Sequence, residues 1–348
     1  MRTLLRALAG ALLVLLGCEL LLRLLPGPTA TFSGRYLDPL IVSYPPHIDW
    51  VSATGWDLRN AHHNPTNSDG FVGTRDFRPD PQAVGLIGDS FIEAAMLPLA
   101  ERPAAQLERA LGTRAVHGMG MPGSSLLDYA ERMRWAQARY GLRDFVLLLE
   151  TGDLRQALCG SGNVQGVCLD PQTLAPRDPP PSEPPGLAKR LLRHSALAQY
   201  LFGQLNLSPQ RLWQQALQQA RPPAEPGAAP PAQGPAVVPD TPHAQAVTEA
   251  FLARIAVLKP RRLVIVLDTA RAALYAGQPR RLEDLQAFAA RARAAGIEIV
   301  DADPIFARHF AEHGLRFDVD PYDRHLNALG IGLLMQAAAR QLDAAPPR

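Results

Sequence analysis

The stretch VGLIGDSF, residues 84–91, decides the fold class of this protein. A short apolar run ends at a glycine, and Asp89 and Ser90 follow where the chain turns toward a helical segment, PAAQLERALG. A buried strand followed by a turn and a helix is the unit from which parallel sheets are built. Ser90 is therefore expected at the carboxyl end of a strand, the edge where parallel sheets gather their ligands.

The same alternation continues on the C-terminal side of this stretch. RAVHGMG and DFVLLLE are predicted strands around the helix LLDYAERMRWAQARYG, and RRLVIVLD and IEIVD are strands among later helices, the last of which starts near Asn327. About five short strands alternating with helices predict a three-layer α/β/α sandwich around a parallel, flavodoxin-like sheet.

Proline-rich segments interrupt this pattern and mark the domain boundaries. We expect a lead-in without regular structure at 27–80 and one main domain at 81–348. An insertion at 171–241 consists of two proline-rich linkers around an amphipathic helical segment, whose leucine stripe is predicted to serve packing.

The N-terminal sequence MRTLLRALAGALLVLLGCELLLRLLPG predicts a membrane anchor over residues 1–26. Its apolar stretch is long enough to span a bilayer, and two arginines precede it. Such a basic flank stays in the cytoplasm, which places the main domain outside the inner membrane. A cleaved signal peptide and lipidation at Cys18 are the alternatives. Glu19 and Arg23 are spaced to pair on one helix face.

Composition excludes several functional classes. With 35 basic and 33 acidic residues and no basic run interleaved with aromatics, the chain is not expected to bind nucleic acid. The sequence predicts no metal site and no cofactor, because it lacks clustered ligand residues and phosphate-binding loops. Cys159 and Cys168 are expected to form a disulfide in an oxidising compartment, with two free thiols as the alternative.

A histidine near the C-terminus is the candidate partner of the serine. The segment DVDPYDRHLNALG places Asp323 and His325 just before the final helix. A loop histidine there is able to accept the serine proton while a carboxylate orients its other ring nitrogen. The alternative is that Asp323 caps the helix and His325 is a surface residue. Asp318 or Asp320 is also available as the orienting acid.

Two further loops follow predicted strands. GMGMPGSS allows close approach of the backbone to a ligand and offers the Gly123 N–H as an oxyanion donor, although a tight turn also explains its glycines. LLLETGDL places Gly152 and Asp153 after the next strand.

In this order, GDSF, GMGMPG, TGDL and DRHLNALG resemble the four sequence blocks of the SGNH/GDSL hydrolases of the exported, membrane-anchored bacterial type. The segment NSDGFVG, residues 67–73, also resembles their lead-in. The resemblance implies Ser90 as nucleophile, His325 as base and Asp323 as orienting acid. It implies an oxyanion hole built from Ser90, Gly123 and the third block.

That third block departs from the family pattern. It usually carries an asparagine whose amide stabilises the oxyanion, and Gly152 stands there in this sequence. Loss of one such donor typically costs about 100- to 1000-fold in rate. Asn163 in the adjacent loop is a substitute candidate.

We therefore expect an esterase that acts on short acyl esters, such as acetyl groups, of cell-envelope polysaccharide or lipid. Two alternatives stay open. One is an O-acyltransferase that passes the acyl group to a sugar hydroxyl, and the other is a catalytically degenerate protein that binds or helps assemble glycan.

Overall fold

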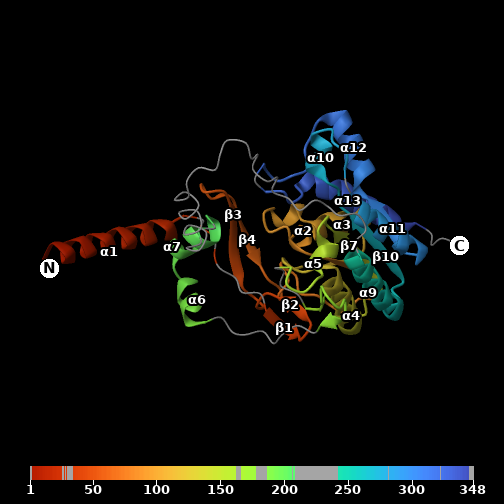
Figure 1. Ribbon diagram of the computed structural model, residues 1–348, viewed down its shortest axis with the longest axis horizontal. Helices are drawn as coiled ribbons and strands as arrows, with labels where there is room; N and C mark the ends of the chain where they lie inside the picture. The colour runs from red at the N-terminus through yellow and green to blue at the C-terminus, as the bar shows by residue number, and fades with distance from the viewer. Residues whose placement is uncertain are drawn as a thin grey trace. The chain divides into compact units, whose positions relative to one another are not determined.

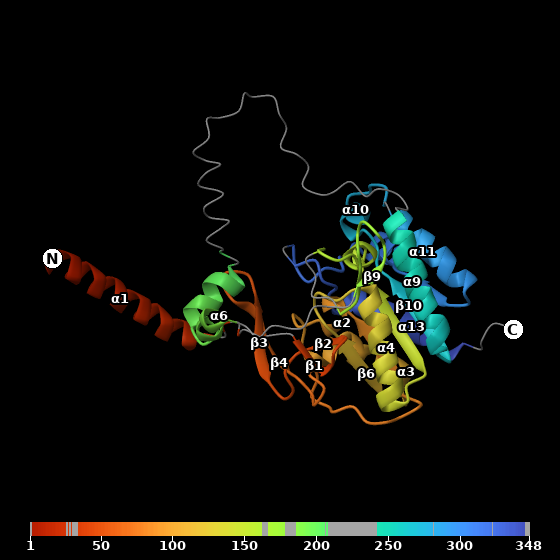
Figure 2. The same cartoon turned by 60° about the horizontal axis from the view of Figure 1, so that its bottom comes forward.

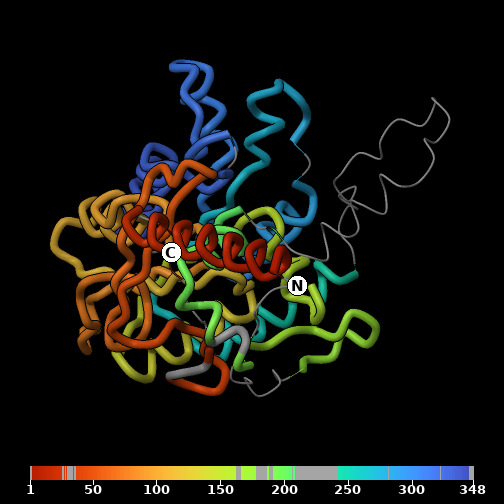
Figure 3. The backbone as a smooth tube through the Cα atoms, turned by 90° about the vertical axis from the view of Figure 1, so that its left-hand side faces the viewer, coloured from red at the N-terminus to blue at the C-terminus, as the bar shows by residue number. Residues whose placement is uncertain are grey.

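The computed structural model describes residues 2–25, 27, 29, 34–161, 166–177, 186–205, 207, 242–280, 282–321 and 323–344, which are coloured in Figure 3. The chain forms two compact units. The anchor unit contains Met1–Thr31, Trp50–His63 and Pro184–Val238, and the sheet unit contains Phe32–Asp49, Asn64–Glu183 and Pro239–Arg348.

The centre of the sheet unit is a five-stranded sheet in the order β11-β10-β7-β5-β6. All neighbouring strands are parallel. The strands are β5 (Val84–Gly88), β6 (Val116–Gly120), β7 (Asp144–Leu149), β10 (Arg262–Leu267) and β11 (Glu298–Asp301). Every residue of β5 and β7 is buried, as continuous apolar runs predict for strands covered on both faces.

Helices cover both faces of this sheet (Figure 1). The longer helices are α3 (Pro103–Leu111), α4 (Leu126–Tyr140), α9 (Pro242–Leu258), α11 (Glu283–Ala294), α12 (Ala302–His313) and α13 (Ala328–Asp343). One apolar core contains residues of α4, α9 and α11, and a second contains residues of α3, α12 and α13. Alternate strand residues feed the two cores, for example Leu147 the first and Leu148 the second. The predicted three-layer α/β/α fold is confirmed.

Short elements occupy the loops of the sheet unit. They are α2 (Ser90–Glu93), η1 (Leu99–Glu101), α5 (Asp153–Gln156), α10 (Arg271–Tyr275) and the hairpin of β8 (Cys168–Leu169) with β9 (Pro176–Arg177). Three of these elements, α2, α5 and α10, follow the carboxyl ends of β5, β7 and β10.

The lead-in is more regular than the sequence indicates. It contains two two-stranded sheets. One is the antiparallel pair of β1 (Gly34–Asp38) and β2 (Ile41–Ser43), and the other pairs β3 (Asp49–Thr54) with β4 (Arg59–Pro65). The expectation of an irregular 27–80 segment is wrong because two-stranded ribbons need only each other's backbone groups and no long apolar alternation. Its buried Phe71 packs on Trp135 of α4, with ring centroids 6.0 Å apart.

The anchor unit contains the predicted N-terminal apolar helix, α1 (Arg2–Arg23), which is long and apolar enough to cross a membrane and has no buried residue. Of the nearby helices, α7 (Ala196–Ala198) contacts α1 (Figure 1), and α6 (Leu187–Leu192) and the π-helix η2 (Gln199–Gln204) precede and follow α7 along the chain; α6 is labelled in Figure 2. The expected helical insertion at 171–241 is therefore helical over part of its described length, and residues 208–241 lie outside the described residues.

Candidate active site

Ser90 lies at the first turn after the central strand β5. Asp89 is the N-cap of α2 and accepts a hydrogen bond from the Phe91 N–H at 2.8 Å, which turns the chain sharply at the strand end. A Cβ on Gly88 would lie only 2.5 Å from Cγ1 of Ile92, so only glycine fits under the returning helix. The backbone thus presents the Ser90 side chain at the carboxyl edge of the sheet.

His325 reaches this serine from a loop 235 residues away in sequence. Its Nε2 lies 2.9 Å from Ser90 Oγ, and its Nδ1 lies 2.6 Å from Asp323 Oδ1. The same carboxylate oxygen accepts the backbone N–H of His325 at 3.0 Å. Because a carboxylate only accepts, Nδ1 carries the proton and Nε2 is left to accept from the serine hydroxyl. The structure brings Ser90, His325 and Asp323 into one hydrogen-bonded chain.

The charges around His325 favour its protonated form. Burial lowers the pKa of His325, but the hydrogen bond to Asp323 and the negative charges of Asp323, Asp89 and Glu93 outweigh it, so that its pKa is raised. Burial raises the pKa of Asp323, but its hydrogen bonds from His325 hold the net pKa below the usual range. An ionised Asp323 therefore stabilises the imidazolium that forms when His325 takes a proton.

Two more carboxyl groups are buried beside the serine. Burial raises the pKa of Asp89 to about 7, and the charge of Glu150 adds to this rise. Burial also raises the pKa of Glu93 to about 7, against a hydrogen bond from Tyr44 and the charge of Arg102. In both groups, burial is the main cause of the raised pKa.

The other two acidic candidates do not contact the His325 ring. Asp318 Oδ1 accepts from Arg271 Nε at 2.8 Å, and Asp320 Oδ1 accepts the backbone N–H of Asp323 at 2.8 Å. Asp320 thereby shapes the turn that carries Asp323. The structure thus places Asp323, of the three, in the position to orient the histidine.

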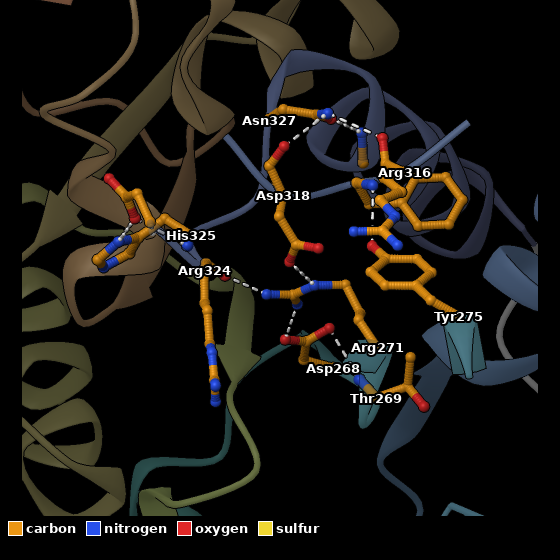
Figure 4. Close-up of polar contacts among 12 residues, drawn as sticks. Asp268, Thr269, Arg271, Tyr275, Arg316, Asp318, Arg324, His325 and Asn327 are labelled. Atoms are coloured by element: carbon orange, nitrogen blue, oxygen red, sulfur yellow. Dashed lines mark hydrogen bonds and ion pairs between the residues drawn. The ribbon is translucent and has the colours of Figure 1, made fainter. Parts of the chain in front are cut away.

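A buried arginine that the sequence analysis did not single out holds the histidine loop to the sheet (Figure 4). Arg271 is only 6% exposed and donates to Asp318, to Asp268 at the end of β10, and to the backbone carbonyl of Arg324. Its guanidinium also lies 5.6 Å from the ring centroid of Phe91, which packs on His325 with centroids 4.8 Å apart. The feature of the sequence that could have pointed to this cluster is Asp268, a carboxylate directly after a buried strand.

Asn327 fixes the other end of this loop. Its side-chain oxygen caps α13 by accepting the Gly330 N–H at 3.0 Å, and its Nδ2 donates to the carbonyls of Arg316 and Asp318 at 2.9 and 3.2 Å (Figure 4). The cap of the final helix is therefore Asn327 rather than Asp323, which leaves the Asp323 carboxylate for the histidine.

Two backbone N–H groups face no acceptor at the edge of the sheet. Neither the Ser90 N–H nor the Gly123 N–H has a hydrogen-bond partner in the part of the chain that the structure describes. Gly123 has φ +75°, in the left-handed region, so glycine suits the turn that exposes its N–H. These two groups are the candidate oxyanion donors.

Gly152 offers no side-chain donor, and the Glu150 carboxylate lies beside it. This carboxylate accepts from Gln156 Nε2 at 2.6 Å and from Thr151 Oγ1 at 3.3 Å. Burial raises the pKa of Glu150. A Cβ on Gly152 would lie 2.3 Å from Glu150 Oε1, so Glu150 occupies the space that an asparagine at this position would need. The substitute candidate Asn163 lies outside the described residues.

Asp153, the last residue of the TGD sequence, supports the structure of its loop. It is fully buried and accepts the Glu150 N–H at 3.0 Å and the Tyr129 hydroxyl at 3.1 Å. Burial raises its pKa well above the usual value. These bonds fix the loop that follows β7 against α4.

Cys159 and Cys168 are joined by a disulfide in the loop beyond this segment. Cys18 in α1 is a free thiol. Over the described ranges, no group of three His, Cys, Asp or Glu side chains is arranged to hold a metal ion.

Comparisons with known proteins add a likeness to solved structures. No family model and no curated protein matches the sequence. Among solved structures, the chain is similar to the crystal structure of a member of the lipolytic protein G-D-S-L family from Veillonella parvula DSM 2008, with 12% identity and a TM-score of 0.38. The match covers 75% of this chain and 99% of that one.

Proposed function

We propose that this protein is a serine ester hydrolase in which Ser90 is the nucleophile, His325 the general base and Asp323 the orienting acid. The observation that carries the proposal is the continuous chain of hydrogen bonds from Ser90 Oγ through the His325 ring to Asp323. A serine hydroxyl is a weak nucleophile until a base held in this geometry takes its proton.

The geometry supports a two-step reaction through an acyl-enzyme. Ser90 Oγ attacks the ester carbonyl as His325 Nε2 takes its proton, and the N–H groups of Ser90 and Gly123 stabilise the oxyanion. The tetrahedral intermediate then breaks its bond to the alcohol oxygen, which receives the proton from His325. A water molecule, deprotonated by His325, attacks the acyl-enzyme and releases the acid and free Ser90.

The proposed location of the protein supports the choice of substrate class. Arg2 and Arg6 precede α1, so the proposed topology keeps them in the cytoplasm and places the sheet unit outside the inner membrane. A disulfide between Cys159 and Cys168 fits an oxidising compartment. Short acyl esters, such as acetyl groups, on polysaccharide or lipid of the cell envelope are the substrates that this location offers.

Two alternatives share this scaffold. In an O-acyltransferase, a sugar hydroxyl replaces water as the acceptor for the acyl group. In a non-catalytic glycan-binding protein, the sandwich persists without turnover, and Gly152 favours this alternative because it brings no side-chain amide to serve as a third oxyanion donor.

Labelling with a fluorophosphonate probe tests the proposal. We expect the full chain in detergent to be labelled, and Ser90→Ala and His325→Ala to abolish labelling while their circular dichroism spectra match the unmodified protein. Unlabelled protein from the same preparation is then assayed with acetylated glycans, in water alone and with an added sugar acceptor, which separates hydrolysis from transfer. Absence of labelling in the folded, unmodified chain would contradict the hydrolase proposal and favour glycan binding.

A further inference from the structure

Exposed apolar side chains are concentrated in the anchor unit. Among the described residues, only Val257 and Leu315 of the large exposed hydrophobic side chains lie in the sheet unit. The others lie on α1 or in the segments next to it. We name the second group the apolar collar: Leu24, Leu25, Trp56, Leu187, Leu191, Leu192 and Phe202. Their exposed fractions range from 46% for Leu25 to 83% for Leu24, so water would contact most of this surface.

The insertion is attached to α1 through a carboxylate. Glu19 accepts hydrogen bonds from the Ser195 hydroxyl at 2.8 Å and from the backbone N–H groups of Ala196 and Leu197, both at 3.0 Å. Arg23, which pairs with Glu19 at 2.8 Å as their spacing predicts, donates to the backbone carbonyl of His194 at 3.0 Å. Residues 194–197 are thereby held against the last turns of α1, beside α6 and α7 (Figure 2).

The length of α1 sets the depth of this attachment. Its 22 residues span about 33 Å, slightly more than the roughly 30 Å hydrocarbon core of a bilayer. With Arg2 at the inner boundary of the hydrocarbon core, Arg23 reaches the opposite boundary between acyl chains and headgroups, and Glu19 lies about one helical turn below it. The segment that Glu19 and Arg23 hold therefore lies close to this outer boundary.

The chemistry of the collar matches such a boundary. Trp56 is 74% exposed, and its backbone carbonyl accepts from the Tyr200 hydroxyl at 2.6 Å, which ties the β3–β4 turn to η2. Tryptophan at the level of the headgroups is typical of membrane proteins. Residues 186–205, GLAKRLLRHSALAQYLFGQL, contain three basic residues and no acidic one. Leucines with interspersed basic residues are typical of segments that lie on anionic lipid.

We propose that residues 187–205 lie in the outer interface of the membrane that α1 spans, with the apolar collar among the acyl chains and the exposed Arg193 at anionic phospholipid headgroups. This inference rests on the proposed membrane location of the protein but not on its esterase chemistry. The insertion is thus a second membrane contact, which restrains the anchor unit at the bilayer surface.

A spin-label depth measurement tests this proposal on the full chain. A nitroxide is attached at Leu191→Cys in a Cys18→Ala background, in vesicles of phosphatidylethanolamine and phosphatidylglycerol. Its accessibility to oxygen, which dissolves in hydrocarbon, is compared with that to a water-soluble nickel complex. Val257→Cys is the matched control, because Val257 is exposed to 80% but lies in the sheet unit. Phe202→Cys provides a second collar position.

The expected result is an oxygen-to-nickel accessibility ratio several-fold higher at both collar positions than at Val257. A collar label as accessible to nickel as the control would overturn the proposal, and low accessibility to both reagents would overturn it in favour of a protein partner or a second copy. A label at Leu12→Cys in α1 tests the membrane location of α1 separately from the membrane contact of the collar. Leu12 in hydrocarbon with an aqueous collar refutes only the collar, whereas an aqueous Leu12 refutes the membrane location as well. Fluorophosphonate labelling of the same samples reports independently on the active site.

Discussion

Replacing Gly152 by asparagine examines the least conventional feature of the active site. A Cβ at this position would lie 2.3 Å from Glu150 Oε1 and 2.6 Å from Gln156 Nε2, whereas ordinary contact begins at about 3.5 Å. Both atoms are ends of flexible side chains, so Glu150 Oε1 needs to move by roughly 1.2 Å, given that contact distance. The backbone of Gly152, with φ −99°, accepts an asparagine without strain.

The magnitudes favour a net gain in rate. Moving Glu150 breaks its hydrogen bond with Gln156, which costs about 1 kcal/mol of folding stability. An added amide donor at the oxyanion stabilises the transition state by about 2.7–4 kcal/mol, or 100- to 1000-fold in kcat. We therefore expect Gly152→Asn to lose a little stability and to hydrolyse p-nitrophenyl acetate at least 100-fold faster than the unmodified protein.

The control for this variant is Gly152→Asp, which has the same shape but no N–H donor. It shares the steric cost and adds negative charge near Glu150, so its rate should not rise. Steady-state kinetics and urea denaturation of both variants give the two quantities separately. If Gly152→Asn folds and its kcat stays at the level of Gly152→Asp, the reasoning that an oxyanion donor is missing at this position is refuted.

Three other substitutions probe the supports of the site. Burial lowers the pKa of His325, and Asp323, together with Asp89 and Glu93, raises it above the usual value. Asp323→Ala should therefore move the acid limb of kcat/KM to lower pH, because the base stays neutral further down the scale, and should reduce the plateau on the order of 10⁴-fold. A pH–rate profile with an unmoved limb would assign that limb to another group. Arg271→Ala leaves buried acids unpaired and should lower the free energy of unfolding by about 3–5 kcal/mol in urea denaturation, and an unchanged value would contradict the buried network. Gly120→Ala places a Cβ 2.2 Å from the backbone nitrogen of Glu93. We expect the free energy of unfolding to fall by about 1–3 kcal/mol and fluorophosphonate labelling to decrease, because α2 is displaced. Full labelling at unchanged stability would show that α2 adapts.

The sequence by itself determined the layers of the fold and the residues most relevant to chemistry. Buried strands such as VGLIG and DFVLLLE are short apolar runs with no other plausible structure, and their carboxyl ends place Ser90 at the expected edge. His325 was identified because an aspartate precedes it by two residues just before the last helix, a local signal that needs no tertiary information. The lead-in hairpins were missed because ribbons of two short strands leave little periodicity in the sequence.

Only the tertiary structure decided the contacts between distant segments. The hydrogen bonds of Arg271 to the histidine loop join parts of the chain about fifty residues apart, and those of Glu19 to the insertion join parts more than 170 apart. The choice of Asp323 over Asp318 and Asp320 depended on which carboxylate the turn aims at the ring. The position of the Glu150 carboxylate beside Gly152 depended on side-chain packing at the strand end. Sequence patterns report burial and local turns, because these follow from neighbouring residues. Pairing between buried charges depends on the packed geometry, which no single segment carries.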